Sequence, residues 1–116
     1  MTTKQDRSYG CLIGGIIGDS CGGRYEFMDN YLEQIETDIK QCGGQLDMLG
    51  GGVWKLIPGQ ITDDSELALT LAQNILDNGK PEQESLAQRY IQWYNSNPFD
   101  IGYSTKNSFS KKTEKK

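Results

Sequence analysis

Histidine is absent from this 116-residue sequence, and cysteine is scarce, occurring only as Cys11, Cys21 and Cys42. No two of these cysteines have the C-x-x-C spacing. The usual zinc-binding patterns, which combine histidine with closely spaced cysteines, are therefore excluded. A small, odd number of cysteines is typical of reduced thiols, so we expect a cytoplasmic protein.

We also expect neither a secretory leader nor a membrane-spanning run. Its first eight residues are polar, which does not fit a signal peptide. The apolar stretch at residues 11–17 is interrupted by glycine and is followed by Asp19. It is much shorter than the roughly 20 apolar residues that cross a bilayer. We therefore expect no membrane partner.

Large aliphatic and aromatic core formers are few. Leu, Ile, Val and Phe together number 24, and valine occurs once. This share, about one fifth, is close to the range of disordered chains, and short domains bury a smaller part of their surface than long ones. We expect an incomplete core with exposed apolar faces that favour association with other proteins.

Charge is unevenly distributed along the chain. The net charge is −4, but residues 106–116 hold five Lys and one Glu, so residues 1–105 carry −8. An acidic body argues against nucleic acid as a partner and suits a cation site, although solvated acidic surface is the commoner cause. The lysine-rich composition of residues 106–116 predicts a basic, disordered tail, and we expect an incomplete folded domain over residues 1–105.

Apolar periodicity predicts helices and shows no convincing strand. We expect a first helix over about 7–21, capped by Asp6, and a second through about 41, opened by an Asn30–Glu33 capping box. A third helix should follow Thr62 and stop at Gly79, and a fourth should cover about 82–94. The predicted class is all-α with long glycine-rich connections. Gly10, Gly14 and Gly18 line one face of the first helix, which predicts another helix packed against its backbone.

Two further features allow more than one interpretation. Gly50-Gly51-Gly52 could accommodate a phosphate, but a flexible connector fits the local pattern better. The aromatic face of the helix over 82–94 is better explained as core or interface than as a surface that stacks on nucleobases.

The run Thr62-Asp63-Asp64 precedes the strongest helical pattern in the chain. Thr and Asp are favoured at helix starts, where they cap the helix and complement its dipole. The same three residues offer a hydroxyl and two carboxylates, the oxygen ligands that Mg²⁺ prefers. Adjacent carboxylates also repel each other unless a cation neutralises them. The local pattern leaves both interpretations open.

Several motifs occur in a fixed order from about Tyr9 to Thr105. They are Gly10-x-Leu12-x-Gly14, Gly18-Asp19-Ser20-Cys21-Gly22, Tyr25-Glu26-Phe27, Gly51-Gly52-Val53-Trp54, Pro58-Gly59-Gln60-Ile61-Thr62-Asp63-Asp64-Ser65-Glu66, Tyr90-Ile91-Gln92-Trp93-Tyr94 and Asp100-Ile101-Gly102. Each alone is weak, but the ordered set resembles the N-terminal part of the ADP-ribosylglycohydrolases.

The resemblance implies an orthogonal helical bundle that cleaves ADP-ribose from protein side chains or related conjugates, with two Mg²⁺ ions, or Mn²⁺, at the cleft floor. Thr62, Asp63 and Asp64 match the N-terminal metal ligands. Glu26 matches an acidic residue on a mobile loop over the metals, and Asp100 matches an acidic position near the active site. Both are our catalytic candidates, and ADP-ribose or an ADP-ribosylated protein is the implied partner.

The sequence departs from the family pattern at one important point. Family members are longer and carry a second ligand group, Asp-x-Asp-Thr/Ser, which these 116 residues do not contain. Only half of the metal site is therefore present, and we expect weak activity or none. The favoured interpretation is an N-terminal portion of such a hydrolase. The alternatives are a non-catalytic pseudoenzyme or interaction module, and an unrelated helical domain in which Thr62-Asp63-Asp64 only caps.

Overall fold

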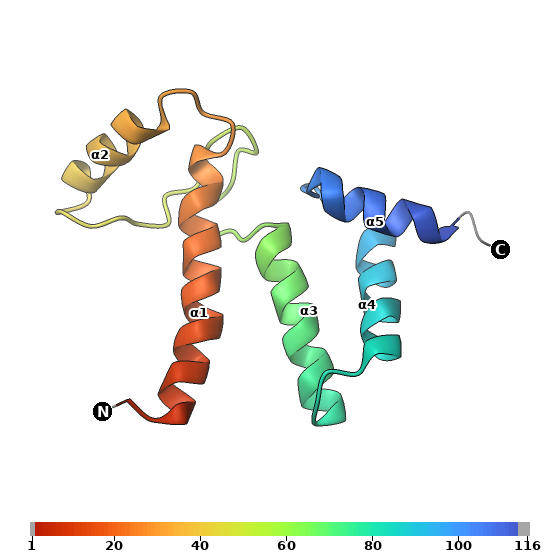
Figure 1. Cartoon of the computed structure of the whole chain (residues 1–116). Helices are drawn as coiled ribbons and strands as arrows, with labels where there is room; N and C mark the ends of the chain where they lie inside the picture. The colour runs from red at the N-terminus through yellow and green to blue at the C-terminus, as the bar shows by residue number, and fades with distance from the viewer. Residues whose placement is uncertain (1, 114–116) are drawn as a thin grey trace. The chain divides into compact units, whose positions relative to one another are not determined.

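The computed structural model describes residues 2–113 and divides into two compact units, residues 1–62 and 63–116. Over the described residues the regular elements are five α-helices and one short 3-10 helix (Figure 1). The predicted all-α class is confirmed. In this part of the chain, no helix has both the length and the apolar character needed to cross a bilayer.

The N-terminal unit begins with α1 (Lys4–Gly22), which continues into the 3-10 helix η1 (Gly23–Tyr25). The helix starts three residues earlier than predicted, because Thr3 rather than Asp6 is the cap. The Thr3 hydroxyl accepts the Asp6 amide at 3.0 Å, and the Asp6 carboxylate accepts the Thr3 amide at 3.0 Å. This reciprocal pair is a capping box, in which Asp6 occupies the third helical position.

Helix α2 (Tyr31–Gln41) lies where the pattern predicts it, but its predicted capping box is wrong. The Asn30 side chain makes no capping hydrogen bond. The backbone of Asn30 has φ −99° and ψ 33°, whereas a capping side chain is usually held by an extended backbone.

Among the described residues of the N-terminal unit, no other segment packs closely along the glycine row of α1, and a helix packed against this row stays a prediction. A Cβ atom built on Gly10, Gly14 or Gly18 would meet nothing within 4 Å. Three large side chains one turn apart on the same helix, Tyr9, Ile13 and Ile17, are exposed as well.

The apolar core is small, as the composition predicts. Among the described residues, the buried apolar side chains are Cys21, Tyr25 and Leu56. Burial raises the pKa of the Cys21 thiol, and all three cysteines are free. Association through the exposed apolar residues stays a prediction.

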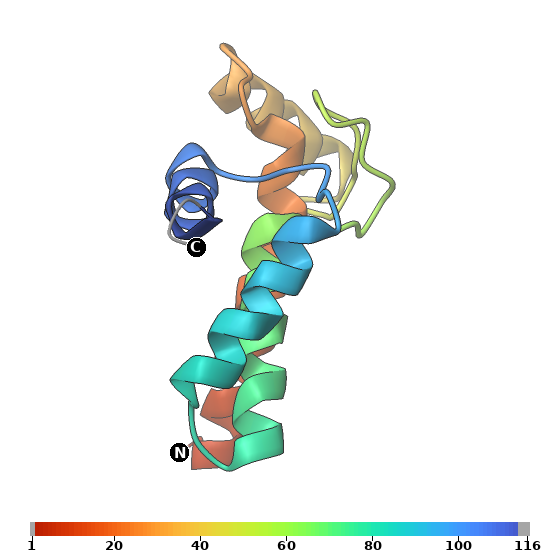
Figure 2. The same ribbon diagram turned by 90° about the vertical axis from the view of Figure 1, so that its right-hand side faces the viewer.

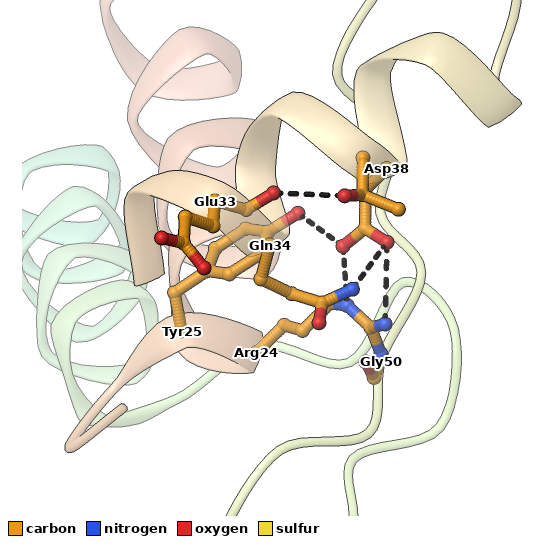
Figure 3. Close-up of polar contacts among 7 residues, drawn as sticks. Arg24, Tyr25, Glu33, Gln34, Asp38 and Gly50 are labelled. Carbon is orange, nitrogen blue, oxygen red and sulfur yellow. Dashed lines mark hydrogen bonds and ion pairs between the residues drawn. The ribbon is translucent and has the colours of Figure 1, made fainter. Parts of the chain in front are cut away.

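A buried ion pair holds the N-terminal unit together (Figure 3). Asp38 on α2 is 2% exposed and accepts hydrogen bonds from Arg24 Nε at 2.8 Å, from the Tyr25 hydroxyl at 2.8 Å and from Gln34 Nε2 at 3.0 Å. The Arg24 guanidinium lowers the pKa of Asp38. Burial, reinforced by the hydrogen bond to Asp38, raises the pKa of Tyr25 to about 12. The cluster therefore joins η1 to α2.

The triple-glycine loop is closely packed, which differs from the flexible connector that the pattern favours. Arg24 Nη1 donates to the Gly50 carbonyl at 2.9 Å, and Gly51 and Leu56 form an isolated antiparallel bridge. A Cβ atom on Gly50 would lie 2.4 Å from the Leu56 carbonyl oxygen, and one on Gly52 would lie 2.5 Å from the Arg24 oxygen. Both residues have positive φ, so the turn needs glycine for conformation and for space.

The C-terminal unit contains α3 (Asp63–Asn78), α4 (Gln83–Asn95) and α5 (Tyr103–Thr113). Helices α3 and α4 lie side by side and antiparallel (Figure 1). The predicted stop at Gly79 is confirmed, since this residue has φ +72° directly after α3. The Asn74 side chain, fully buried, accepts the Glu82 amide at 2.9 Å and so fixes the start of α4.

Helix α5 corrects the predicted disorder over residues 106–113. In Figure 2, α5 is seen nearly along its axis while α4 lies lengthwise, so the two helices cross steeply. The Phe109 ring lies 5.5 Å from Tyr94, 6.2 Å from Tyr90 and 6.4 Å from Trp93, between ring centroids. This aromatic cluster explains the helix, because one half-buried ring packed against three others can anchor an otherwise polar segment. Residues 114–116 of the predicted tail lie outside the described residues.

Candidate metal and active site

Thr62 is the best-defined member of the predicted metal site, and it belongs to the N-terminal unit. Its side chain is almost fully buried, with 4% of the residue exposed. The backbone amide donates to Asp19 Oδ2 at 2.9 Å, and the hydroxyl donates to Asp19 Oδ1. Asp19 lies near the end of α1, so residues 43 positions apart in the sequence meet here.

Gly23 provides the space for the Thr62 methyl group. A Cβ atom on Gly23 would lie 3.3 Å from Thr62 Cγ2 and 2.8 Å from Leu56 Cδ1. The hydroxyl and the methyl of Thr62 therefore each have a defined neighbour. A β-branched side chain fixed at both branches has little freedom about χ1.

Asp63 and Asp64 are the first two residues of α3, in the C-terminal unit. Their position in the first turn is favourable for the helix dipole, so a structural contribution at the helix start is compatible with a metal role. Asp63 is half-buried, and its Oδ2 accepts the Gly102 amide at 2.9 Å. Asp64 is exposed.

Asp100 lies near the start of α3, because the hydrogen bond between the Gly102 amide and Asp63 holds its segment there. It is 9% exposed and stands two residues before Gly102. The structure thus brings the predicted residues Asp63 and Asp100 into one region of the C-terminal unit, joined by the hydrogen bond between Gly102 and Asp63.

Glu26 directly follows η1 in the N-terminal unit, and its carboxylate has a specific partner. Glu26 Oε2 accepts the indole N–H of Trp54 at 2.8 Å. The next residue, Phe27, has φ 58°, an exposed side chain, and a ring in edge contact with Trp54 at 6.4 Å. Trp54 therefore holds the segment that carries Glu26 by two neighbouring side chains.

A similar hydrogen bond occurs in the C-terminal unit. The indole N–H of Trp93 on α4 donates to Glu66 Oε2 on α3 at 2.6 Å. Each of the two tryptophans in the chain thus donates to a glutamate within its own unit.

Asp19 is the site residue that the sequence prediction missed. The motif containing it is part of the family resemblance, but the pattern gave it no role. One signal was present: Asp19 is the only charged residue between Arg7 and Arg24. Asp19 is half-buried in the structure, and a carboxylate removed from water in this way is stabilised by hydrogen bonds, which Thr62 donates.

The donor chemistry of residues 62–64 fits a hard divalent cation. The Thr62 hydroxyl donates its one proton to Asp19, and a hydroxyl oxygen then still has lone pairs with which to bind a cation. Two carboxylates follow in the next two positions. Within residues 2–113, however, no three Cys, Asp or Glu side chains gather into a metal-binding group. The residues present therefore fit one part of a metal site.

Comparison with known proteins identifies the family. Residues 1–116 match the family model of the ADP-ribosylglycohydrolases, and the chain belongs to this family. The sequence is 41% identical over 105 residues to L543 of Acanthamoeba polyphaga mimivirus, a candidate ADP-ribosyl glycohydrolase. That alignment covers 90% of this chain and 31% of the viral protein.

Two bacterial relatives have named activities. The ADP-ribosylarginine hydrolase Tri1 of Pseudomonas putida is 34% identical over 117 residues, covering 93% of this chain and 29% of Tri1. The ADP-ribosyl-[dinitrogen reductase] glycohydrolase of Rhodospirillum rubrum is 34% identical over 99 residues, covering 84% of this chain and 32% of that enzyme. The chain thus spans about a third of the length of these curated relatives.

Proposed function

We propose that this chain carries the N-terminal metal-binding half of a hydrolase that removes ADP-ribose from modified protein side chains or related conjugates. The observation that carries the proposal is the run Thr62-Asp63-Asp64, in which a buried, oriented hydroxyl is followed by two carboxylates at the start of α3. Membership of the ADP-ribosylglycohydrolase family supports the substrate class.

Thr62, Asp63 and Asp64 would hold the ion, Mg²⁺ or Mn²⁺, through oxygen atoms. When bound, such an ion orients ribose hydroxyls and lowers the pKa of a coordinated water. The protein's own contribution is to hold these oxygens in place: Asp19 fixes Thr62, and the Gly102 amide fixes one oxygen of Asp63.

Glu26 and Asp100 are the proposed catalytic carboxylates. Glycosidic cleavage passes through an oxocarbenium-like state that nearby carboxylates stabilise. Glu26 accepts the Trp54 indole with Oε2, which orients the carboxylate while its second oxygen can accept a proton from water. Asp100 stands beside the Asp63 region, where a buried carboxylate would stabilise positive charge.

The metal proposal predicts that the chain binds Mn²⁺ weakly and that Asp63→Ala/Asp64→Ala weakens this binding by at least about tenfold. The physical reason is the loss of both anionic oxygen ligands, which leaves one neutral hydroxyl. Loss of the free-Mn²⁺ electron paramagnetic resonance signal during titration measures the affinity directly.

The matched control is Glu36→Ala/Glu84→Ala. It removes two negative charges at exposed helix positions outside the site, so it tests whether net charge alone attracts the ion. Equal weakening by the two double variants would contradict the metal site at residues 62–64. If the wild type binds no Mn²⁺ in the titration, the metal-site proposal is contradicted altogether.

A non-catalytic interaction module is the second candidate, and one observation favours it: Tyr9, Ile13 and Ile17 form an exposed apolar row on α1. Residues 62–64 supply one part of a metal site, so we expect this chain by itself to release little or no ADP-ribose from a modified protein. Release of radiolabelled ADP-ribose is the measurement. Strong Mg²⁺-dependent release that survives Asp64→Ala would contradict both the site and the mechanism.

A further inference from the structure

We propose that Asp19 is a positioning residue, which aims the Thr62 hydroxyl oxygen at the cation. This inference rests on the proposed function, because it assigns a role in the same metal site. Asp19 would not touch the ion itself. It would act through the two hydrogen bonds that it accepts from the Thr62 amide and hydroxyl.

The direction of the hydroxyl hydrogen bond carries the argument. A threonine hydroxyl has one proton and two lone pairs. An ionised carboxylate can only accept a hydrogen bond, so the Thr62 hydroxyl donates its proton to Asp19. The lone pairs of the hydroxyl oxygen then face away from this proton and can bind a ligand. A carboxylate partner also makes the oxygen a better ligand, as outer-shell carboxylates do for metal-bound imidazoles.

The second hydrogen bond and the methyl contact fix the orientation. The amide bond at 2.9 Å holds the Thr62 backbone to the same carboxylate that holds its hydroxyl. On the other branch, the methyl group occupies the space that Gly23 leaves open. Rotation about χ1 would therefore break a charge-assisted hydrogen bond and move the methyl at the same time. Serine lacks the methyl group and valine lacks the hydroxyl, so threonine alone of the three can make both contacts.

A double-mutant cycle on Mn²⁺ affinity tests this role. The four proteins are the wild type, Asp19→Asn, Thr62→Val and Asp19→Asn/Thr62→Val. An asparagine amide can donate to the Thr62 oxygen and compete for the lone pair, so we expect Asp19→Asn to weaken Mn²⁺ binding about tenfold. In the Thr62→Val background, Asp19→Asn should cause no further loss of affinity, because the hydroxyl oxygen that both hydrogen bonds to Asp19 position is then absent.

This non-additivity is a readout that a merely structural role would not produce. Thermal unfolding of the four proteins shows whether they fold. If Asp19→Asn does not fold, Asp19→Glu takes its place in the cycle, since it keeps the charge and moves it by one methylene. A partial loss of affinity is then expected, and it should again vanish in the Thr62→Val background.

The outcomes separate the inference from the proposed function. The role of Asp19 is overturned if the wild type and Asp19→Asn bind Mn²⁺ equally, or if the two losses of affinity add in the double variant. Either result leaves the metal site standing. Failure of the wild type to bind Mn²⁺ would overturn both. A tenfold loss that disappears with the Thr62 hydroxyl establishes the positioning role.

Discussion

Asp38→Ala is expected to destabilise the N-terminal unit by about 3–5 kcal/mol, the usual cost of removing one partner from a buried ion pair. Asp38 is 2% exposed and accepts hydrogen bonds from Arg24, Tyr25 and Gln34. Without it, the partly buried Arg24 guanidinium loses its charged partner and keeps only the Gly50 carbonyl, and the buried Tyr25 hydroxyl loses its acceptor. The loss is a large fraction of the roughly 5–15 kcal/mol that stabilises a typical domain. Urea denaturation measures it.

The ion pair between Arg89 and Asp77 provides the control. Both side chains are much more exposed than Asp38, and exposed pairs contribute about 0–1 kcal/mol. Asp77→Ala should therefore leave the urea midpoint nearly unchanged. Similar costs for Asp38→Ala and Asp77→Ala would show that burial of the Arg24–Asp38 pair does not stabilise the unit.

The same carboxylate gives the unit an acid dependence. The pKa of Asp38 in the folded chain is lowered by Arg24, whereas an unfolded aspartate titrates near pH 3.9. Its contribution is therefore complete above about pH 4 and is lost as the pH falls through the lower, folded pKa. A pH series of urea denaturation should show a smaller acid-induced loss for Asp38→Asn than for the wild type.

Gly50→Ala is expected to destabilise the N-terminal unit by about 3 kcal/mol. An alanine there costs roughly 1–2 kcal/mol for a left-handed backbone, and overpacking typically adds about 1–3 kcal/mol. The new Cβ atom would lie 2.4 Å from the Leu56 carbonyl oxygen and 2.7 Å from the Ile57 carbonyl carbon. These are backbone atoms, which cannot turn aside as a flexible side chain could. Chemical denaturation gives the free energy of unfolding.

Gly43→Ala separates the two contributions. Gly43 has φ +75°, close to the +69° of Gly50, but a Cβ atom there would meet nothing within 4 Å. Gly43→Ala should therefore cost only the free energy of placing alanine on a left-handed backbone, about 1 kcal/mol. Equal costs for the two substitutions would mean that the loop moves to admit the methyl group, contrary to its close packing in the structure.

The helices of this chain could be predicted where their apolar residues recur with helical spacing. Helix α3 follows from the rows of Leu and Ala after Thr62 and from the stop at Gly79. Helix α5 could not be predicted in this way, because Phe109 is the single anchoring ring in a polar, basic segment. Its partners on α4 become apparent only when the two helices are seen together.

The residues of the candidate site could also be predicted only in part. Thr62, Asp63 and Asp64 stand together in the sequence, so their chemistry could be read from three adjacent residues. Asp19 could not be found so easily, because its contact with Thr62 spans 43 positions and depends on how α1 meets a distant loop. Periodicity describes neighbours within one element and says little about contacts of this range.

The hydrogen bonds of the two indoles give each unit its own optical signal. A negative charge beside an indole ring shifts the wavelength at which the ring emits, and Trp54 and Trp93 each donate to a glutamate of their own unit. With one tryptophan replaced by phenylalanine, the remaining emission follows a single half of the chain. The emission wavelength of Trp54 would then report whether Glu26 stays hydrogen-bonded to the indole, without any added dye.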